Sequence, residues 1–238
     1  MASSIRTISR WSGRCVLTSG ACWHKAAMAE YSESFKRAIE FVLSQEGGWA
    51  DNPKDPGGAT FKGVTLKLFR AWRNNPNVSK QDLQQASIDE IFALYHQLFW
   101  KQVQGDSLPP GVGLMAFDAA VNSGVPNAGL ALQRAVNTFG VHKLAEDGIV
   151  GHKTAAAVGN IDLHKLVAEF ASRRMVFYGA LQTFSMFGFG WARRLMLAVQ
   201  IATALVEVGK QVVSAVEAAK AADQPAAPAL PAAEGPTT

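Results

Sequence analysis

Cysteine is nearly absent from this chain: Cys15 and Cys22 are the only two in 238 residues. Because both lie within residues 1–28, the rest of the chain needs no disulfide and tolerates a reducing or an oxidising compartment. The spacing of the two cysteines fits no zinc motif, and the five histidines are scattered rather than paired. We therefore predict no metal site and no cofactor.

Most of the chain also lacks a surplus of positive charge. The net charge is +4, from 23 basic and 19 acidic residues. Residues 1–28 hold four basic residues and no acid, so taking these four from the 23 leaves 19 basic residues against 19 acidic ones. A balanced body has no excess charge for phosphate contacts, which argues against a nucleic-acid partner.

Long apolar runs are missing as well. Residues 1–28 are rich in Ser and Arg, contain no run suited to a secretory signal, and are predicted to form a disordered basic arm. Residues 195–208 are apolar, but a membrane span needs roughly 20 such residues. Polar residues interrupt the segment and its continuation at Gln200, Thr203, Glu207 and Lys210. We expect an amphipathic helix that faces the core or a dimer partner, and no transmembrane segment.

The most informative feature present is Glu46, followed directly by Gly47 and Gly48. Four apolar residues share one helical face with Glu46, at about 100° per residue: Phe35, Ile39, Val42 and Leu43. We expect Glu46 to face the core and one of the two glycines to supply a left-handed turn. Burial and the negative end of the helix dipole both disfavour the anion, as a general acid requires. The alternative is a solvated last helical turn.

Two further acids follow in a loop rich in Asp, Gly and Pro. Asp51 and Asp55 lie five and nine residues after Glu46, and Thr60 lies fourteen residues after it. Hydrolysis of a glycosidic bond typically uses a pair of carboxyl groups that flank the bond. The alternative is a connector that uses Asp as a turn former.

Together with motifs further along the chain, this pattern resembles the glycoside hydrolase family 108 muramidases. These are lysozyme-like enzymes found as phage endolysins and as muramidases that assist toxin secretion. The matching fragments run in the family's order over roughly residues 33–195: 46–49, 55–60, 63–65, Tyr95, 99–100, 108–112, 117–124 and 131–135. Residues 147–154 resemble the turn of a peptidoglycan-binding-type module, completed by Arg174, Tyr178 and residues 190–194.

The resemblance implies a mainly α fold. A lysozyme-like helical domain with at most a small β-hairpin within residues 49–65 is followed by a helical peptidoglycan-binding-type module. The expected divisions are a disordered arm (1–28), a catalytic domain (29–140), the module (141–194), a C-terminal helix (195–220) and a disordered tail (221–238).

Capping residues and apolar periodicity place the helices. We expect starts at Ser32 or Ser34, at Ser87 with Glu90 as a capping box, at Asn127 and at Asp162. Further predictions are helices over 66–72, 88–103, 113–122 and 192–220, a turn at Ser79 or Asp82, and an aromatic bend over 184–191.

The resemblance also implies the activity. It predicts an N-acetylmuramidase that cleaves the β-1,4 bond between N-acetylmuramic acid and N-acetylglucosamine, with Glu46 as general acid. Asp55 matches the nine-residue spacing of phage-type lysozymes, whereas Thr60 lies five rather than six residues beyond it, which leaves its water-positioning role open. The candidate substrate contacts are Trp100, Asn122, Tyr95 and Asp51, with packing as the alternative for the aromatic residues.

Two other functions stay open: a lytic transglycosylase, and a peptidoglycan-binding protein without activity. Asp55 and Thr60 favour hydrolysis over the transglycosylase. The expected partner is bacterial peptidoglycan, reached in the periplasm or cell wall. Since no signal peptide is recognised, export from the cytoplasm is expected to need a holin or a secretion channel.

Overall fold

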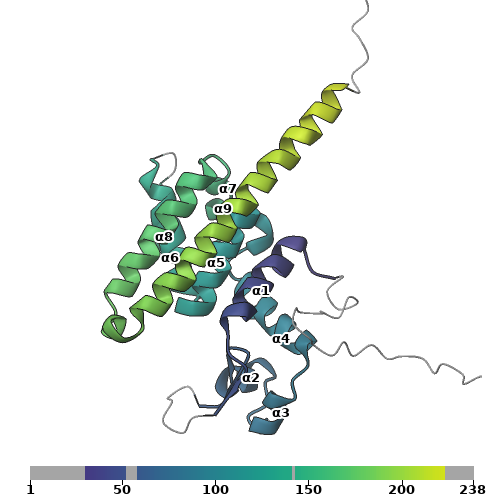
Figure 1. The fold of residues 1–238 in the computed structure, drawn as a ribbon, viewed down its shortest axis with the longest axis vertical. Coiled ribbons are helices and arrows are strands. Elements are labelled where there is room, and N and C mark those ends of the chain that lie inside the picture. Colours follow the sequence, from purple (N-terminus) through teal and green to yellow (C-terminus); the bar gives the residue numbers. More distant parts are fainter. Residues whose placement is uncertain (1–29, 52–57, 141–142, 223–238) are drawn as a thin grey trace, which may run out of the picture.

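The computed structural model describes residues 30–51, 58–140 and 143–222 (Figure 1). The predicted basic arm, Asp55 and nearly all of the predicted tail lie outside the described residues. The prediction of a mainly α-helical fold with a small β element is confirmed, because the helices account for most of the described chain.

The first helix, α1 (Glu33–Gln45), begins where the sequence predicts. Ser32 is its N-cap, and the Ser32 Oγ accepts a hydrogen bond from the Phe35 amide at 3.2 Å. Its apolar face is the predicted one, since Phe35, Ile39 and Val42 have no exposed surface. This face fixes the rotation of α1, and with it the direction in which the chain leaves the helix.

A small antiparallel sheet follows α1, where a hairpin was expected. Its strand order is β1-β2-β3, and Trp49 pairs with Phe61 while Phe61 pairs with Val64. The strands are β1 (Trp49–Ala50), β2 (Thr60–Phe61) and β3 (Val64–Thr65).

Three short helices complete this lobe, each started by a side-chain cap. Thr65 caps the first, while Ser79 with Asp82 and Ser87 with Glu90 form capping boxes on the other two. The predicted turn at Ser79 is thus a short helix. The helices are α2 (Leu66–Trp72), α3 (Lys80–Gln84) and α4 (Ile88–Tyr95).

The helix predicted over 88–103 is wrong in its second half. It continues from α4 as a π-helical turn, η2 (His96–Trp100), and then as a 3-10 turn, η3 (Gly105–Ser107). Gln104 is left-handed (φ 53°), which turns the chain so that Gly105 lies directly on the buried Trp100 ring. Burial of this large ring therefore overrides the helical periodicity.

The centre of the molecule is α5 (Pro110–Ser123), which is buried from Gly111 to Ala120. It begins three residues before the predicted start, because proline is well suited to the first position of a helix. Gly111 lies inside α5 rather than before it, and a side chain there would meet the backbone carbonyl of Ala202. The last helix, α9 (Phe184–Ala222), can therefore pack very closely on α5.

The next helix, α6 (Val125–Thr138), has Gly124 as its N-cap rather than the predicted cap, Asn127. The Asn127 side chain lies in the first turn and donates to the Ser123 carbonyl at 2.7 Å. Gly124 has a φ of 86°, which lets α6 begin immediately after α5 ends.

Three helices form the C-terminal part: α7 (His152–Val158), α8 (Leu163–Gly179) and α9 (Phe184–Ala222). Asp162 caps α8 as predicted. The predicted bend over 184–191 is wrong, because α9 is already helical at Phe184 and continues through the predicted helix 192–220. Gly188 allows this, since the Phe184 ring occupies the space that a side chain would need.

Figure 1 shows α8 and α9 beside α5 and α6, with the end of α9 extending past the other helices. The hydrophobic core is continuous, and contains Phe117 of α5 together with Phe170 of α8 and Ala198 of α9. The Phe184–Glu217 part of α9 is long and apolar enough to cross a membrane by length and composition. Leu195, Ala198 and Ala202 of this part are fully buried, although only 22% of its apolar window is buried in all.

Candidate active site

Glu46 lies immediately after α1 and caps its C-terminus. Its backbone is extended (φ −93°, ψ 145°), and its amide bonds to the Leu43 carbonyl at 3.3 Å. The predicted left-handed turn at Gly47 or Gly48 is wrong, because neither glycine has a positive φ. The Glu46 side chain is 20% exposed, so the predicted partial burial is confirmed.

A guanidinium group from the far end of the sequence holds the Glu46 carboxylate. Arg194 of α9 donates from Nη1 to Glu46 Oε1 at 2.7 Å, and from Nε to Asp118 Oδ1 at 2.8 Å. The planar guanidinium can make both bonds in fixed directions, which an ammonium group cannot do. Arg194 therefore links the Glu46 carboxylate to the Asp118 carboxylate.

Asp118 is the buried centre of this network. It projects from α5 with no exposed surface, and its second oxygen, Oδ2, accepts from Arg174 Nη2 at 2.7 Å. Burial alone would lower the pKa of Arg174, but the charge of Asp118 outweighs it and raises the pKa. For Arg194 too, burial lowers the pKa, while Asp118 and then Glu46 raise it above its ordinary value. Both guanidinium groups are therefore held as cations.

The network continues from Arg174 to Asn122 at the end of α5. Arg174 Nη2 also donates to the Tyr178 hydroxyl at 2.8 Å, and that hydroxyl donates to Asn122 Oδ1 at 2.9 Å. Asn122 is half-buried. Its side-chain oxygen is thus fixed, while its position at a helix end leaves it partly open to solvent.

The other side of Glu46 is lined by Gly63 and Tyr95. Gly63 has a φ of 76°, and a Cβ there would lie 2.8 Å from Glu46 Oε2 and 2.5 Å from the Tyr95 hydroxyl. That hydroxyl donates to the Lys62 carbonyl at 2.9 Å. Burial, and then the charge of Glu46, raise the pKa of Tyr95 well above its ordinary value, so Tyr95 stays neutral.

Two of the predicted substrate contacts are core residues in this structure. Trp100 has no exposed surface and packs edge-on against Phe117, with ring centroids 5.6 Å apart. Tyr95 is 1% exposed. A side chain without exposed surface cannot touch a bound sugar, so we do not retain Trp100 or Tyr95 as substrate contacts.

The remaining predicted site residues surround the loop after β1. Asp51 forms an ion pair with Lys80 of α3 at 2.9 Å, which ties the end of β1 to α3. Thr60 begins β2, and its hydroxyl donates to the Gly58 carbonyl at 3.3 Å. Asp55, between them in sequence, lies outside the described residues.

The sequence reasoning assigned no role to Asp118, Arg174, Tyr178 and Arg194. A signal was present, because Asp118 is the one charged residue in the buried run from Gly111 to Ala120. A second signal was the segment 170–206, which contains four arginines and no acid. Buried charges need partners, and here the partners of Asp118 are two arginines that lie 56 and 76 residues further along the chain.

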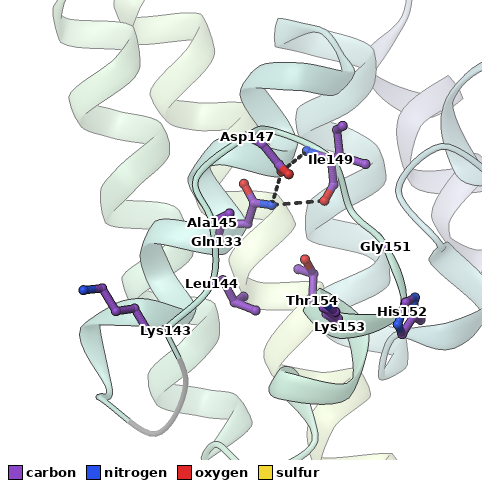
Figure 2. Close-up of a pocket in the computed structure, with 10 residues that line it drawn as sticks. All are labelled: Gln133, Lys143, Leu144, Ala145, Asp147, Ile149, Gly151, His152, Lys153 and Thr154. Atoms are coloured by element: carbon purple, nitrogen blue, oxygen red, sulfur yellow. Dashed lines mark hydrogen bonds between the residues drawn. The ribbon is translucent and has the colours of Figure 1, made fainter.

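A separate hollow of about 400 Å³ lies between α6, the segment before α7 and α7 itself (Figure 2). Gln133, which is 2% exposed, donates to Asp147 Oδ1 at 2.7 Å and to the Ile149 carbonyl at 3.0 Å. The bond from Gln133 lowers the pKa of Asp147, so this carboxylate is ionised at neutral pH. His152 and Lys153 also line the hollow. Within the described residues there is no group of three or more His, Cys, Asp or Glu side chains that could hold a metal ion.

Comparison with known proteins agrees with this arrangement. Residues 39–124 match the model of the family described as glycosyl hydrolase 108. The structure of Brucella abortus SagA is 36% identical, with a TM-score of 0.65, and the match covers 73% of this chain and 95% of that chain. No curated protein matches.

The helical fold, the carboxylate at the end of α1 and these matches define a lysozyme-type glycoside hydrolase. The chain belongs to the glycosyl hydrolase 108 family. This membership supports peptidoglycan hydrolase activity, with the cell wall or periplasm as the place of action.

Proposed function

We propose that this protein is an N-acetylmuramidase that cleaves the β-1,4 bond between N-acetylmuramic acid and N-acetylglucosamine, with Glu46 as general acid. The observation that carries the proposal is the position of the Glu46 carboxylate, partly exposed and held at 2.7 Å by Arg194. Arg194 is in turn fixed by the buried carboxylate of Asp118.

The two oxygens of Glu46 suit different tasks. Oε1 is bonded to Arg194, whereas Oε2 packs closely on Gly63 and has no hydrogen bond among the described residues, so it is the oxygen we assign to proton transfer. When Glu46 gives its proton to the leaving oxygen, it becomes an anion next to the guanidinium. Arg194 would stabilise that charge as it forms in the transition state, which favours the reaction more than it favours the bound substrate.

We propose Asp55, rather than Asp51, as the second functional carboxylate, to orient water or to stabilise the oxocarbenium-like charge. The ion pair between Asp51 and Lys80 supports this choice, because it gives Asp51 a structural role in anchoring the loop. Asp55→Asn should therefore lower the hydrolysis rate far more than Asp51→Asn, at an unchanged melting temperature. The opposite ranking would show that the second carboxylate is misassigned.

Asn122 and Thr60 remain proposed contacts of the substrate and of the attacking water, respectively. The hollow beside Gln133 (Figure 2) is proposed to hold glycan or stem peptide, because it combines a carboxylate with nearby basic side chains. Export through a holin or a secretion channel, the lack of a nucleic-acid partner and the lack of a membrane span are part of the same proposal.

Mass spectrometry of digested peptidoglycan tests the proposed reaction. A muramidase leaves reducing muramic acid ends, because water attacks the cleaved bond. Anhydro ends would instead identify a lytic transglycosylase, and the absence of products would identify a binding protein without activity. Either of those results would overturn the proposal.

A further inference from the structure

The end of α9 carries an apolar face that nothing covers within the described part of the chain. Its first half packs on the core through Ala198, Ala202 and Leu205, at spacings of four and three residues. At about 100° per residue the same face continues through Gly209, Val212 and Val216. Val212 and Val216 are nevertheless 57% and 48% exposed. The face that is buried against α5 is thus left open where α9 extends past the other helices (Figure 1).

An apolar groove begins at the point where α9 leaves the body. It has a volume of about 400 Å³ and lies between α9 and the starts of α5 and α8. Pro109, Pro110 and Leu163 line it from the body, and Val206 and Val213 line it from α9. The groove adjoins the exposed valines, because Val213 lines the groove and lies three residues, less than one helical turn, before Val216.

The free part of α9 is too short to be stable by itself. From Val208 to Ala222 it spans about 22 Å, at about 1.5 Å per residue. An isolated helix of this length is marginal in water, and helices in proteins are stabilised mainly by packing of their apolar face. The segment therefore calls for a partner that covers its valines.

We propose that this partner is a second copy of the chain, whose α9 packs antiparallel along the same face. Lys210 and Glu217 lie seven residues apart and so occupy the same edge of the stripe, beside Val213. When two identical helices run antiparallel, equivalent edges face each other. A twofold axis near Val213 and Ser214 places Lys210 of each copy opposite Glu217 of the other, as a self-complementary interface requires.

The composition of the face favours this partner over a lipid surface. Helices that lie in a membrane interface present Trp, Phe or Leu on one side and are rich in Lys and Arg on the other. Beyond Leu205 the apolar face of α9 is made mainly of valine, and the charges at its edge are of both signs, Lys210 and Glu217.

The pairing would join two active sites in one particle. On a polymeric wall, two linked sites raise the effective affinity without any new contact. This consequence rests on the proposed function, whereas the pairing itself does not and is tested without substrate.

Analytical ultracentrifugation of the full chain over a concentration series tests the pairing. We expect a dimer that Val212→Asp converts to a monomer, while Val176→Asp, an equally drastic change at a 73% exposed position on α8, has no effect. Lys210→Glu or Glu217→Lys alone sets like charges opposite each other and should weaken the dimer about tenfold. The double variant should restore the wild-type dissociation constant.

A wild-type monomer at every concentration would overturn the pairing, and so would a double variant that is weaker than either single one. Sedimentation with phosphatidylglycerol vesicles tests the alternative partner, a lipid surface. If the wild type is a monomer that binds these vesicles, and the Val212→Asp variant no longer binds them, the apolar face contacts a membrane instead. Activity enters none of these measurements, so their failure leaves the proposed muramidase reaction untouched.

Discussion

At the residue scale, the proposed active site is organised by one buried carboxylate, Asp118. It accepts from Arg174 on one side and from Arg194 on the other, and Arg194 passes the constraint on to Glu46. Buried ions are costly unless they are paired and hydrogen-bonded. Because Asp118 and the two arginines lie on three different helices, the same network that positions Glu46 also joins α5, α8 and α9.

Arg194→Lys tests this positioning role. An ammonium group cannot bond to Asp118 and Glu46 in the same fixed geometry, so we expect at least about a tenfold loss of kcat with the protein still folded. The lost hydrogen bonds should also lower the free energy of unfolding by about 1–3 kcal/mol, measured in urea. Arg193→Lys is the matched control, since Arg193 is exposed and has no ion pair among the described residues. Equal effects of the two changes would contradict the role of Arg194.

Residue by residue, the sequence predicts what depends on local spacing. The buried face of α1 and the position of Glu46 at its end could be predicted from the sequence, because four apolar residues at helical spacing suffice to define a face. The partner of Glu46 could not be predicted from the sequence, because Arg194 lies 148 residues away and only the packing of α9 on α5 brings it near. The glycines after Glu46 were misread because an extended residue can also end a helix.

At the element scale, α9 decides whether the site is complete. It carries Arg194, covers α5, and starts in a Gly-rich aromatic segment that local propensity predicts as a bend. Glycine costs a helix up to about 1 kcal/mol per residue. Packing of Phe184 over Gly188, and of Ala202 on Gly111, overrides that cost. Such tertiary effects are not visible in the sequence of the helix itself.

Gly111→Ala should separate propensity from packing. Alanine favours a helix over glycine by up to about 1 kcal/mol, but its methyl group would meet the Ala202 carbonyl and force α9 away from α5. Overpacking of this kind costs about 1–3 kcal/mol, so we expect net destabilisation and lower activity, as α9 carries Arg194.

The control for that change is Gly190→Ala on α9, where nothing lies within 4 Å of the added methyl group. It should leave the free energy of unfolding unchanged or raise it by up to about 1 kcal/mol. If Gly111→Ala also stabilised the protein in urea denaturation, the close contact between α5 and α9 would be refuted.

At the scale of the whole molecule, the predicted catalytic domain and the predicted C-terminal module share one hydrophobic core. Phe117, Phe170 and Ala198 belong to the same cluster although they come from three of the predicted divisions. The sequence indicated this outcome only indirectly, through the lack of a Pro-, Ser- or Gly-rich spacer between Phe139 and Asp147.

A fragment that ends near Gly140 should therefore fail to fold. It would expose the buried surface of α5 and leave Asp118 without both of its arginines. We expect insoluble protein, or an unfolded far-ultraviolet circular dichroism spectrum. A soluble fragment with cooperative unfolding and full activity would show instead that the two parts are independent.

The central claim is that Glu46 supplies the proton for cleavage of the glycosidic bond, and Glu46→Gln tests it most directly. The measurement is the rate at which reducing muramic acid ends appear in a peptidoglycan digest, with circular dichroism to confirm that the variant is folded. Loss of general acid catalysis predicts a rate roughly 10²–10⁴-fold lower than that of the wild type. A folded Glu46→Gln variant that releases these ends at the wild-type rate would contradict the claim.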